Sequence, residues 1–248
     1  MEILVLVVFL ALFMELIDSS LGMMYGTILS PLLISVGVDP KLVIPSILIS
    51  QAIGGIIGTI RHHNYNSANF KGWTKDTKIV SAIVLPGVLA CLLGAFIAVS
   101  IPSWALKTYI GLLVIIMGVL CLKPYSYKFA WWKIYVIGIV SAFHKALSGG
   151  GFGPVASTGK ILGGVNPKVS IATTTYAEVP ICLLSFLFWM ILRGGIEIAF
   201  PLALCLGAAF GAIIGPWITY KMKLNKLRSV VGILAIISGI WCMTKIFI

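Results

Sequence analysis

Residues 144–154, "HKALSGGGFGP", lie inside an apolar stretch where a membrane-spanning helix is expected. Three consecutive glycines, a fourth two positions later and a proline would break such a helix. Glycine in a helix interior costs about 1 kcal/mol relative to alanine, and proline about 3 kcal/mol. Irregular backbone at membrane depth is tolerated only where protein or a water-filled cavity shelters it. The stretch therefore predicts a sheltered turn that divides a membrane helix in two.

The composition around this stretch is that of an integral membrane protein. The 248 residues are 60% hydrophobic and 10% charged, with a mean hydropathy of +1.09. Soluble domains carry about 25% charged residues. The net charge of +11 does not predict a nucleic-acid partner, because most basic residues lie in short loops between apolar blocks. We therefore expect an all-α, multi-pass protein of the cell membrane, with lipid as its surroundings.

The apolar blocks divide into two kinds by length. A helix needs about 20 apolar residues to cross a bilayer. Blocks 2–36 and 134–163 are too long for one crossing, and glycines interrupt both of them. The blocks with ordinary spanning length are 41–60, 79–100, 105–122, 169–192, 197–220 and 229–247.

The two long blocks begin two similar halves of the chain. Shifting the sequence by 127 positions aligns residues 21–51 with 148–178, with nine identities in 31 positions and no gap. Several identities are glycine or proline, which constrain the path of the backbone. The pattern predicts a duplicated four-block unit, 1–122 and 130–248, within a single membrane domain. The identical pairs are Gly22/Gly149, Gly26/Gly153, Ser30/Ser157, Ile34/Ile161, Gly37/Gly164, Val38/Val165, Pro40/Pro167, Lys41/Lys168 and Ile44/Ile171.

Basic residues indicate how the halves are oriented. Loops 61–78, 123–133 and 221–228 each hold three or four Lys or Arg residues, so all three are expected on the cytoplasmic side. Three blocks separate the second loop from the third. Both loops can lie on the cytoplasmic side only if block 134–163 enters the membrane and returns to the side from which it started. Each half then crosses an odd number of times. The halves are predicted to be inverted repeats, as in many secondary transporters, each beginning with a glycine-broken helical hairpin.

The glycine turn is a candidate anion site. A helix that starts near Pro154 would present free N–H groups and a positive dipole end. The related turn at 19–27 would meet it near the midplane from the opposite side. The alternative is that the glycines serve only close helix packing. The expected site residues are Lys145, Ser148, Gly149, Gly150, Gly151, Phe152 and Gly153, then Gly22, Tyr25, Gly26 and Thr27, and the hydroxyls of Thr173 and Thr174.

Ionisable residues inside the apolar blocks are functional candidates, because each costs roughly 2.5–3.5 kcal/mol at mid-bilayer. The shift of 127 pairs Asp18 with Lys145, and Gln51 with Glu178. Lys145 either attracts an anion or forms a structural salt bridge with Asp18 or Glu178. The candidates for carrying a coupled proton are His144, Glu178 and Asp18.

The remaining polar residues also allow purely structural interpretations. A packed histidine is the alternative for His144, and helix–helix hydrogen bonding is the alternative for Thr173 and Thr174. Lys160 lies four residues from the loop at Gly164, so it is expected to extend to the membrane interface. The pair His62 and His63 is expected to mark the interface, since no third metal ligand accompanies it. Glu15 is a further intramembrane acid.

Two segments resemble the sulfite exporter TauE/SafE family of membrane transporters, and the resemblance covers essentially the whole chain. They are "SGGGFGPVASTGKILGGVNPKVSIATTT" at 148–175, with its weaker copy in the first half, and "RHHNYNSANFKGW" at 61–73. The resemblance implies transport of sulfite, a sulfonate or a related small organosulfur anion. The sequence departs from the family pattern at 23–25, at Thr158 and at Lys160.

The expected function is secondary transport of such an anion, by export or uptake, through alternating access. No Walker motif indicates ATP hydrolysis. An enzyme is not expected, because His144 and Ser148 lack a rhomboid-type Gly-x-Ser-Gly context and no catalytic residues, cofactor or metal site stand out. A channel or carrier for a different small ion or solute is the alternative. The sequence leaves open the anion, the direction, the coupling of protons and the oligomeric state.

Overall fold

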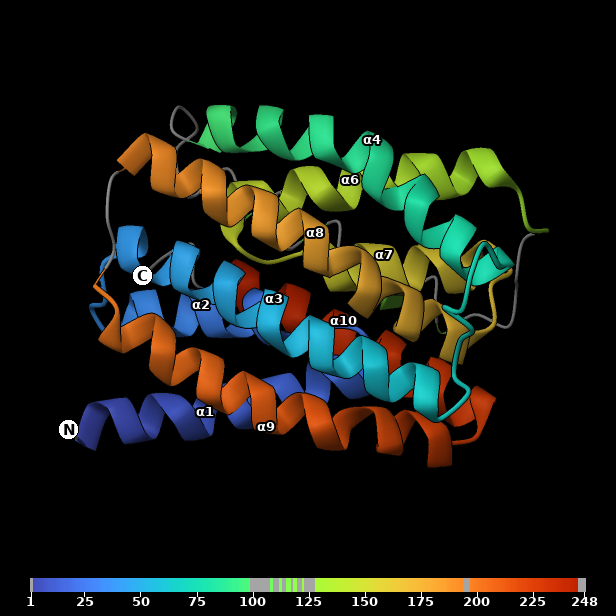
Figure 1. The fold of residues 1–248 in the computed structure, drawn as a ribbon, viewed down its shortest axis with the longest axis horizontal. Helices are drawn as coiled ribbons and strands as arrows, with labels where there is room; N and C mark the ends of the chain where they lie inside the picture. Colours follow the sequence, from blue (N-terminus) through green and yellow to red (C-terminus); the bar gives the residue numbers. More distant parts are fainter. Residues whose placement is uncertain are drawn as a thin grey trace.

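The computed structural model describes residues 2–98, 128–193 and 197–244, and positions 108, 112, 115, 116, 118, 119 and 122 between them. Within these residues the regular structure is entirely helical, which confirms the all-α prediction, and the helices run roughly along the long axis (Figure 1). The predicted block 105–122 lies outside the described residues except for those isolated positions. The helices are α1 (Glu2–Leu21), α2 (Tyr25–Ser35), α3 (Pro40–Asn64), α4 (Lys75–Ala98), α6 (Trp131–Ser148), α7 (Phe152–Leu162), α8 (Pro167–Arg193), α9 (Ala199–Lys221) and α10 (Leu224–Thr244).

Five of the described helices are long and apolar enough to cross a membrane. Their apolar spans are Leu4–Leu21, Leu42–Asn64, Lys75–Gly94, Pro167–Ile191 and Ala199–Lys221. Each span reaches the length that a bilayer requires of a helix. The prediction of a polytopic helical membrane protein is therefore confirmed.

Both long apolar blocks are broken helices, as the glycines predict. Helix α6 ends at Ser148 and α7 begins at Phe152, with Gly149 (φ 69°) and Gly151 (φ 77°) between them in the left-handed region. Residues with a Cβ rarely adopt this conformation, so these two glycines set the position of the break. Helix α7 has only 11 residues, too few to cross a bilayer.

The first half follows the same backbone path. Gly22 has a φ of 74° and Met24 a φ of 109°, and they stand 127 positions before Gly149 and Gly151. Helices α2 and α7 have the same length and begin 127 residues apart, and the starts of α3 and α8 are also 127 residues apart. Met24 adopts a positive φ that costs a non-glycine residue about 1–2 kcal/mol, because its Cβ approaches a carbonyl oxygen. Both halves thus have positive φ angles at the same two turn positions, although Met24 stands where the second half has glycine.

Helices from the two predicted halves pack against each other across the bundle. Helix α1 starts at the end of the bundle that holds the N-terminus, whereas α6 starts at the other end (Figure 1). The first helix of each half packs mainly on the fourth helix of the other half, α1 on α9 and α6 on α4. Helices α3 and α8 pack against each other between these pairs. The two broken helices are thereby held inside the bundle.

Small residues let α1 and α9 approach closely. A Cβ at Gly207 would lie 2.2 Å from the carbonyl oxygen of Val8, and a Cβ at Gly211 would lie 2.5 Å from that of Leu12. Gly215 continues the row one turn later along α9. Such a row of small residues is a common way for membrane helices to pack, because lipid supplies no hydrophobic force between them.

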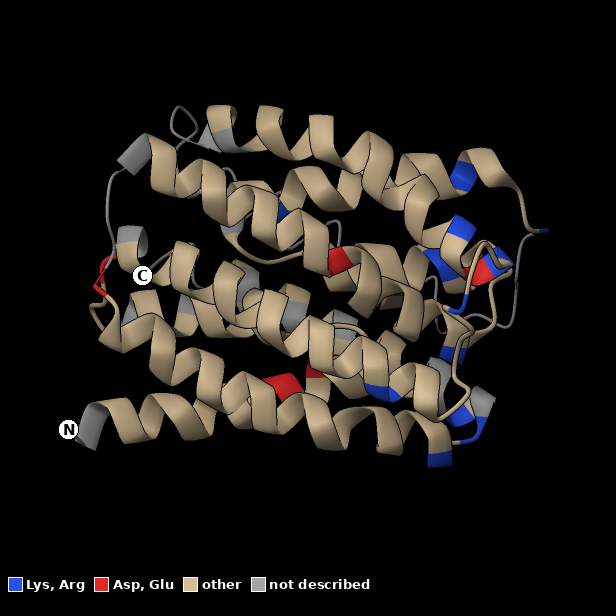
Figure 2. Cartoon of the chain, in the orientation of Figure 1, with Lys and Arg blue, Asp and Glu red and all other residues tan. Residues whose placement is uncertain are grey.

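The basic loops lie together at one end of the bundle. Tyr65 stacks on Tyr220 with ring centroids 5.7 Å apart, and Lys168 donates to the Tyr220 carbonyl at 2.6 Å. In the described part of the second basic loop, the Phe129 ring lies 4.6 Å from the ammonium of Lys75. Figure 2 shows most of the coloured Lys and Arg positions at this end. The positive-inside rule assigns such an end to the cytoplasm.

Candidate functional site

The two turns cross at the centre of the bundle in direct backbone contact. A Cβ at Gly26 would lie 2.1 Å from the carbonyl oxygen of Gly149, and a Cβ at Gly153 would lie 2.5 Å from that of Gly22. The two contacts are equivalent under the shift of 127. A Cβ at Gly150 would lie 2.7 Å from the Gly26 carbonyl. These glycines are required for the close approach, and the opposing backbone fills the space beside them.

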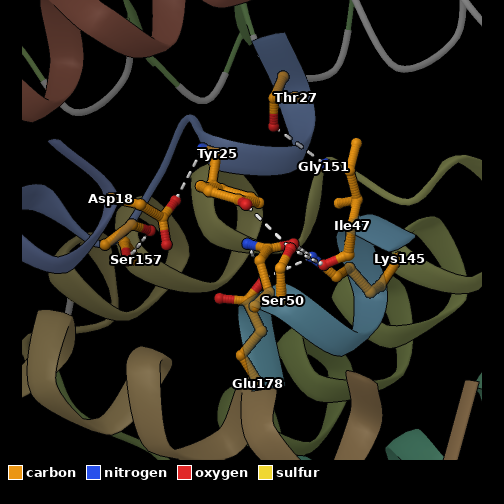
Figure 3. Close-up of polar contacts among 11 residues, drawn as sticks. Asp18, Tyr25, Thr27, Ile47, Ser50, Lys145, Gly151, Ser157 and Glu178 are labelled. Atoms are coloured by element: carbon orange, nitrogen blue, oxygen red, sulfur yellow. Dashed lines mark hydrogen bonds and ion pairs between the residues drawn. The ribbon is translucent and has the colours of Figure 1, made fainter. Parts of the chain in front are cut away.

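Hydroxyl groups tie the crossing turns together. The Ser157 hydroxyl lies 2.8 Å from the carbonyl oxygen of Gly22 and 2.9 Å from the Thr174 hydroxyl. The amide of Gly151 donates to the hydroxyl of Thr27 at 3.0 Å (Figure 3). Thr27 and Thr174 therefore lie at the crossing, each hydrogen-bonded to a partner from another helix or turn.

The two short helices differ in what lies at their N-termini. The carboxylate of Asp18 accepts a hydrogen bond from the Tyr25 amide at 3.0 Å, so α2 begins on an internal anion (Figure 3). A carboxylate at this position is stabilised by the helix dipole. The matched position in the second half is Lys145, and the amide of Gly151 at the start of α7 faces the neutral hydroxyl of Thr27. Of the two N-termini, only that of α2 has a carboxylate among its described partners.

Lys145, Gln51 and Glu178 form a buried triad beside the crossing. The Lys145 ammonium lies 2.7 Å from Glu178 Oε1 and also donates to Gln51 Oε1. Gln51 Nε2 donates to Glu178 Oε1 at 3.0 Å. The salt bridge predicted for Lys145 is therefore formed with Glu178 (Figure 3). A buried pair of this kind is costly to break, because the remaining charge would have no partner.

Two expectations about basic residues are wrong. Lys160 does not extend to the interface: it is 0% exposed, and its ammonium donates to the Ser170 carbonyl at 2.9 Å and to Thr173 Oγ1 at 2.8 Å. The reason is that every residue of α7 is buried, so the side chain turns onto α8. His62 does not mark the interface either. It is buried, and its Nε2 lies 2.9 Å from the Ser19 carbonyl oxygen.

The other predicted residues lie near the crossing with ordinary packing partners. Tyr25 is fully buried and its hydroxyl lies 2.8 Å from Ser50 Oγ. Phe152 is fully buried at the start of α7, in the hydrophobic core that contains α4 and α6 residues. His144 is buried on α6 and packs edge-on against Phe143, with ring centroids 6.1 Å apart. Ser148 is the last residue of α6.

The structure adds a buried acid that the 127-residue pairing did not single out. The Glu15 carboxylate accepts a hydrogen bond from the Ser19 hydroxyl at 2.5 Å. The spacing of four residues on one helix face was the sequence signal for this contact. Glu15 interacts electrostatically with Asp18, Glu178 and Lys145. Within the described residues, no group of three His, Cys, Asp or Glu side chains is arranged to hold a metal ion.

This arrangement defines a class of protein before any comparison. Helices of membrane-spanning length enclose two broken helices whose turns cross beside buried charged residues. Broken helices and buried ionisable groups at mid-membrane are the features with which membrane transporters bind their substrates.

Comparison with known proteins gives the family. The model of the family described as "Sulfite exporter TauE/SafE" matches residues 7–242, so the chain belongs to this family. A curated relative, "Probable membrane transporter protein YtnM" of Bacillus subtilis (strain 168), is 27% identical over 247 residues. The match covers 94% of this chain and 80% of the relative. The chain is therefore a multi-pass transporter of the cell membrane and not an enzyme.

Proposed function

We propose that this transporter is a secondary carrier for a small anion, most favourably sulfite, a sulfonate or a related organosulfur anion. The substrate class rests on the family description, which names sulfite export. The buried ammonium of Lys145, in the last turn of α6 before the glycine turn, is consistent with an anionic substrate. Export and uptake are both compatible with this function.

We further propose that alternating access arises from two inverted repeats, residues 1–122 and 130–248. Matched helix starts at Tyr25 and Phe152, and matched positive φ angles at Gly22 and Gly149, support the duplication. The opposite starting points of α1 and α6 support the inversion (Figure 1). Inverted repeats allow one scaffold to adopt two states, open to opposite sides of the membrane, in which the two repeats exchange conformations around a central site.

The observation that carries the anion proposal is the difference between the two short-helix N-termini. In the first half, Asp18 supplies a carboxylate to the start of α2. In the second half, Lys145 stands at the sequence position that matches Asp18, so no side-chain carboxylate is supplied from there to the start of α7. A substrate anion at the start of α7 would take the role that the Asp18 carboxylate has at the start of α2. When the crossing turns separate, the substrate would contact the turn residues Ser148, Gly149, Gly150, Gly151, Phe152 and Gly153 together with Thr27, Thr173 and Thr174. The first-half turn residues Gly22, Tyr25 and Gly26 would complete the wall of the site.

The test is current from purified protein in proteoliposomes on a solid-supported membrane, with concentration jumps of sulfite, thiosulfate, sulfoacetate, taurine, sulfate and chloride. The double variant Lys145→Met/Glu178→Gln removes both charges and leaves neither unpaired. We expect it to lose the anion current roughly 10- to 100-fold, since hydrogen bonds to charged groups contribute about 1.5–3 kcal/mol. Lys71→Met, in the exposed basic loop, is the matched control and should retain the current.

Two results would contradict the proposal. Wild-type current in the double variant would show that Lys145 does not bind the anion. Absence of current with every organosulfur anion, in folded wild-type protein, would reject the substrate class. Currents with cations or neutral solutes would then support the alternative, a carrier or channel for a different substrate.

A further inference from the structure

We propose that Glu15 is the proton-binding residue that couples proton movement to anion transport, and that Ser19 and His62 position its carboxyl group. This inference rests on the proposed anion transport and adds the coupled ion and its site.

The Glu15 carboxyl group is buried and incompletely hydrogen-bonded. Its residue is 2% exposed, and Oε1 accepts from the Ser19 hydroxyl at 2.5 Å. Oε2 has no hydrogen-bond partner among the described residues. Burying an ionised carboxylate without such partners costs far more than burying the neutral acid. In this state the carboxyl group therefore carries a proton.

The space around the carboxyl group suits a proton rather than a larger ion. A Cβ at Gly54 on α3 would lie 2.8 Å from the Glu15 carboxyl carbon. A Cβ at Gly211 on α9 would lie 2.9 Å from Glu15 Cβ. Backbone thus encloses the side chain from two helices. A proton needs no additional space at such a site.

Within the part of the chain that the structure describes, Glu15 forms no salt bridge. Among the described residues, the ammonium that interacts with it is that of Lys145, which is already paired with Glu178. The other nearby acid, Asp18, accepts the amide at the start of α2. The titratable groups on the packed helices are Asp18 on α1, Tyr25 on α2, His62 on α3, Lys145 on α6, Glu178 on α8 and Cys205 on α9, which lies near Tyr25.

Two facing rows of residues lead from Glu15 to the basic end. On α3, Gly54, Gly58 and His62 follow at four-residue intervals, and on α1 Glu15 and Ser19 do so. A Cβ at Gly58 would lie 3.7 Å from Ser19 Oγ. His62 Nε2 lies 2.9 Å from the Ser19 carbonyl oxygen, in the last turn of α3 before the basic loop. His62 therefore holds the Ser19 backbone in place, and the Ser19 hydroxyl positions the Glu15 carboxyl group on the side of the bundle where the basic loop begins.

Coupling follows from the charge balance at the crossing. Lys145 is already paired with Glu178, so an anion that also binds Lys145 would leave this cluster, which includes Asp18, with excess negative charge. A proton on Glu15 removes a competing negative charge from the same cluster. Anion binding and Glu15 protonation then favour each other, and the two ions cross the membrane in the same direction.

The first test uses wild-type and Glu15→Gln proteoliposomes with an entrapped pH-sensitive dye and an imposed sulfite gradient. The glutamine mimics the permanently protonated acid. We expect Glu15→Gln to keep sulfite exchange but to lose sulfite-driven proton movement and the pH dependence of sulfite flux. The matched control is Glu197→Gln, which removes an exposed carboxylate and should behave as the wild type.

A second measurement does not depend on a functional variant. Difference infrared spectra of the wild type between low and high pH should contain the band of a protonated carboxyl group, and sulfite should retain that band to higher pH. Carbodiimide labelling of the same sample, located by mass spectrometry, should modify Glu15 and decrease as the pH rises.

The outcomes separate the two proposals. Sulfite flux without proton movement, or proton movement unchanged in Glu15→Gln, would overturn the role of Glu15 and leave anion transport standing. Labelling that never reaches Glu15 would also overturn it. Absence of any anion flux from folded wild-type protein would overturn anion transport and the coupling together.

Discussion

Gly153→Ala is the change that most directly tests the crossing of the two turns. A Cβ at Gly153 would lie 2.5 Å from the carbonyl oxygen of Gly22 and 2.7 Å from the Cα of Met23. Both neighbours are backbone atoms of the opposing turn, so neither can move away by changing a rotamer. The substitution therefore pushes the two halves apart at their contact.

The expected cost can be worked from these distances. Ordinary contacts of a Cβ are 3.4–4 Å long, so the Gly22 carbonyl would have to retreat by about 0.9 Å. Extra volume in a well-packed core costs about 1–3 kcal/mol. For a chain of 150–250 residues, each kcal/mol lowers Tm by about 2–4 °C, so we expect a decrease of roughly 2–12 °C.

The assay is thermal unfolding of the purified protein in one detergent, with Gly163→Ala as the matched control. Gly163 directly follows the last residue of α7 and has a negative φ, but a Cβ there would meet its nearest atom, the Gly159 carbonyl oxygen, at 3.2 Å. Its Tm should change far less than that of Gly153→Ala. Equal melting of the two variants would show that the turns do not cross at Gly153, and the reasoning about the site would fail with it.

Two further predictions concern the buried pair and the topology. The single variants Lys145→Met and Glu178→Gln should each destabilise the protein by about 3–5 kcal/mol, because the remaining charge is unpaired. The double variant should recover most of the loss of Tm. If the losses of Tm in the two single variants added up in the double variant, the pairing would be contradicted. For the topology, single cysteines are introduced into a variant without native cysteines. A membrane-impermeant maleimide should label Lys71→Cys and Lys223→Cys from one side of the membrane and Val36→Cys from the opposite side. Labelling of all three from the same side would contradict the fold.

The helix breaks were predictable from sequence because backbone conformation determines them. Positive φ angles at Gly149 and Gly151 are required for the chain to reverse between α6 and α7, and glycine is the residue that adopts them readily. The same reasoning reached the first half through the shift of 127, even though Met24 replaces one glycine there. A signal of this kind is local and needs no knowledge of the packing.

The surroundings of the buried charges were less predictable, because they depend on which helices pack together. Distance along the chain to the nearest loop suggested an interfacial Lys160, but the neighbouring helices enclose all of α7. The contact of Ser19 with His62 joins two helices more than forty residues apart, and no repeat or motif marks it. Only the four-residue spacing of Glu15 and Ser19 was visible in the sequence.

The two halves keep the same backbone at the crossing and differ in their buried charges. Gly22 and Gly149 make equivalent contacts, whereas Asp18 is matched by Lys145, and Glu15 is matched by Ala142. In the proposed mechanism the backbone scaffold is therefore pseudo-symmetric, whereas the ion-binding side chains are not. Glu15, the acid that carries the proton, belongs to the first half, and Lys145, whose ammonium binds the anion, belongs to the second half. The inward-open and outward-open states then need not have equal energies, because exchanging the roles of the halves does not exchange their charges. Proton and anion gradients would act on different halves of one pseudo-symmetric structure, and the contact of the two turns would transmit each half's state to the other.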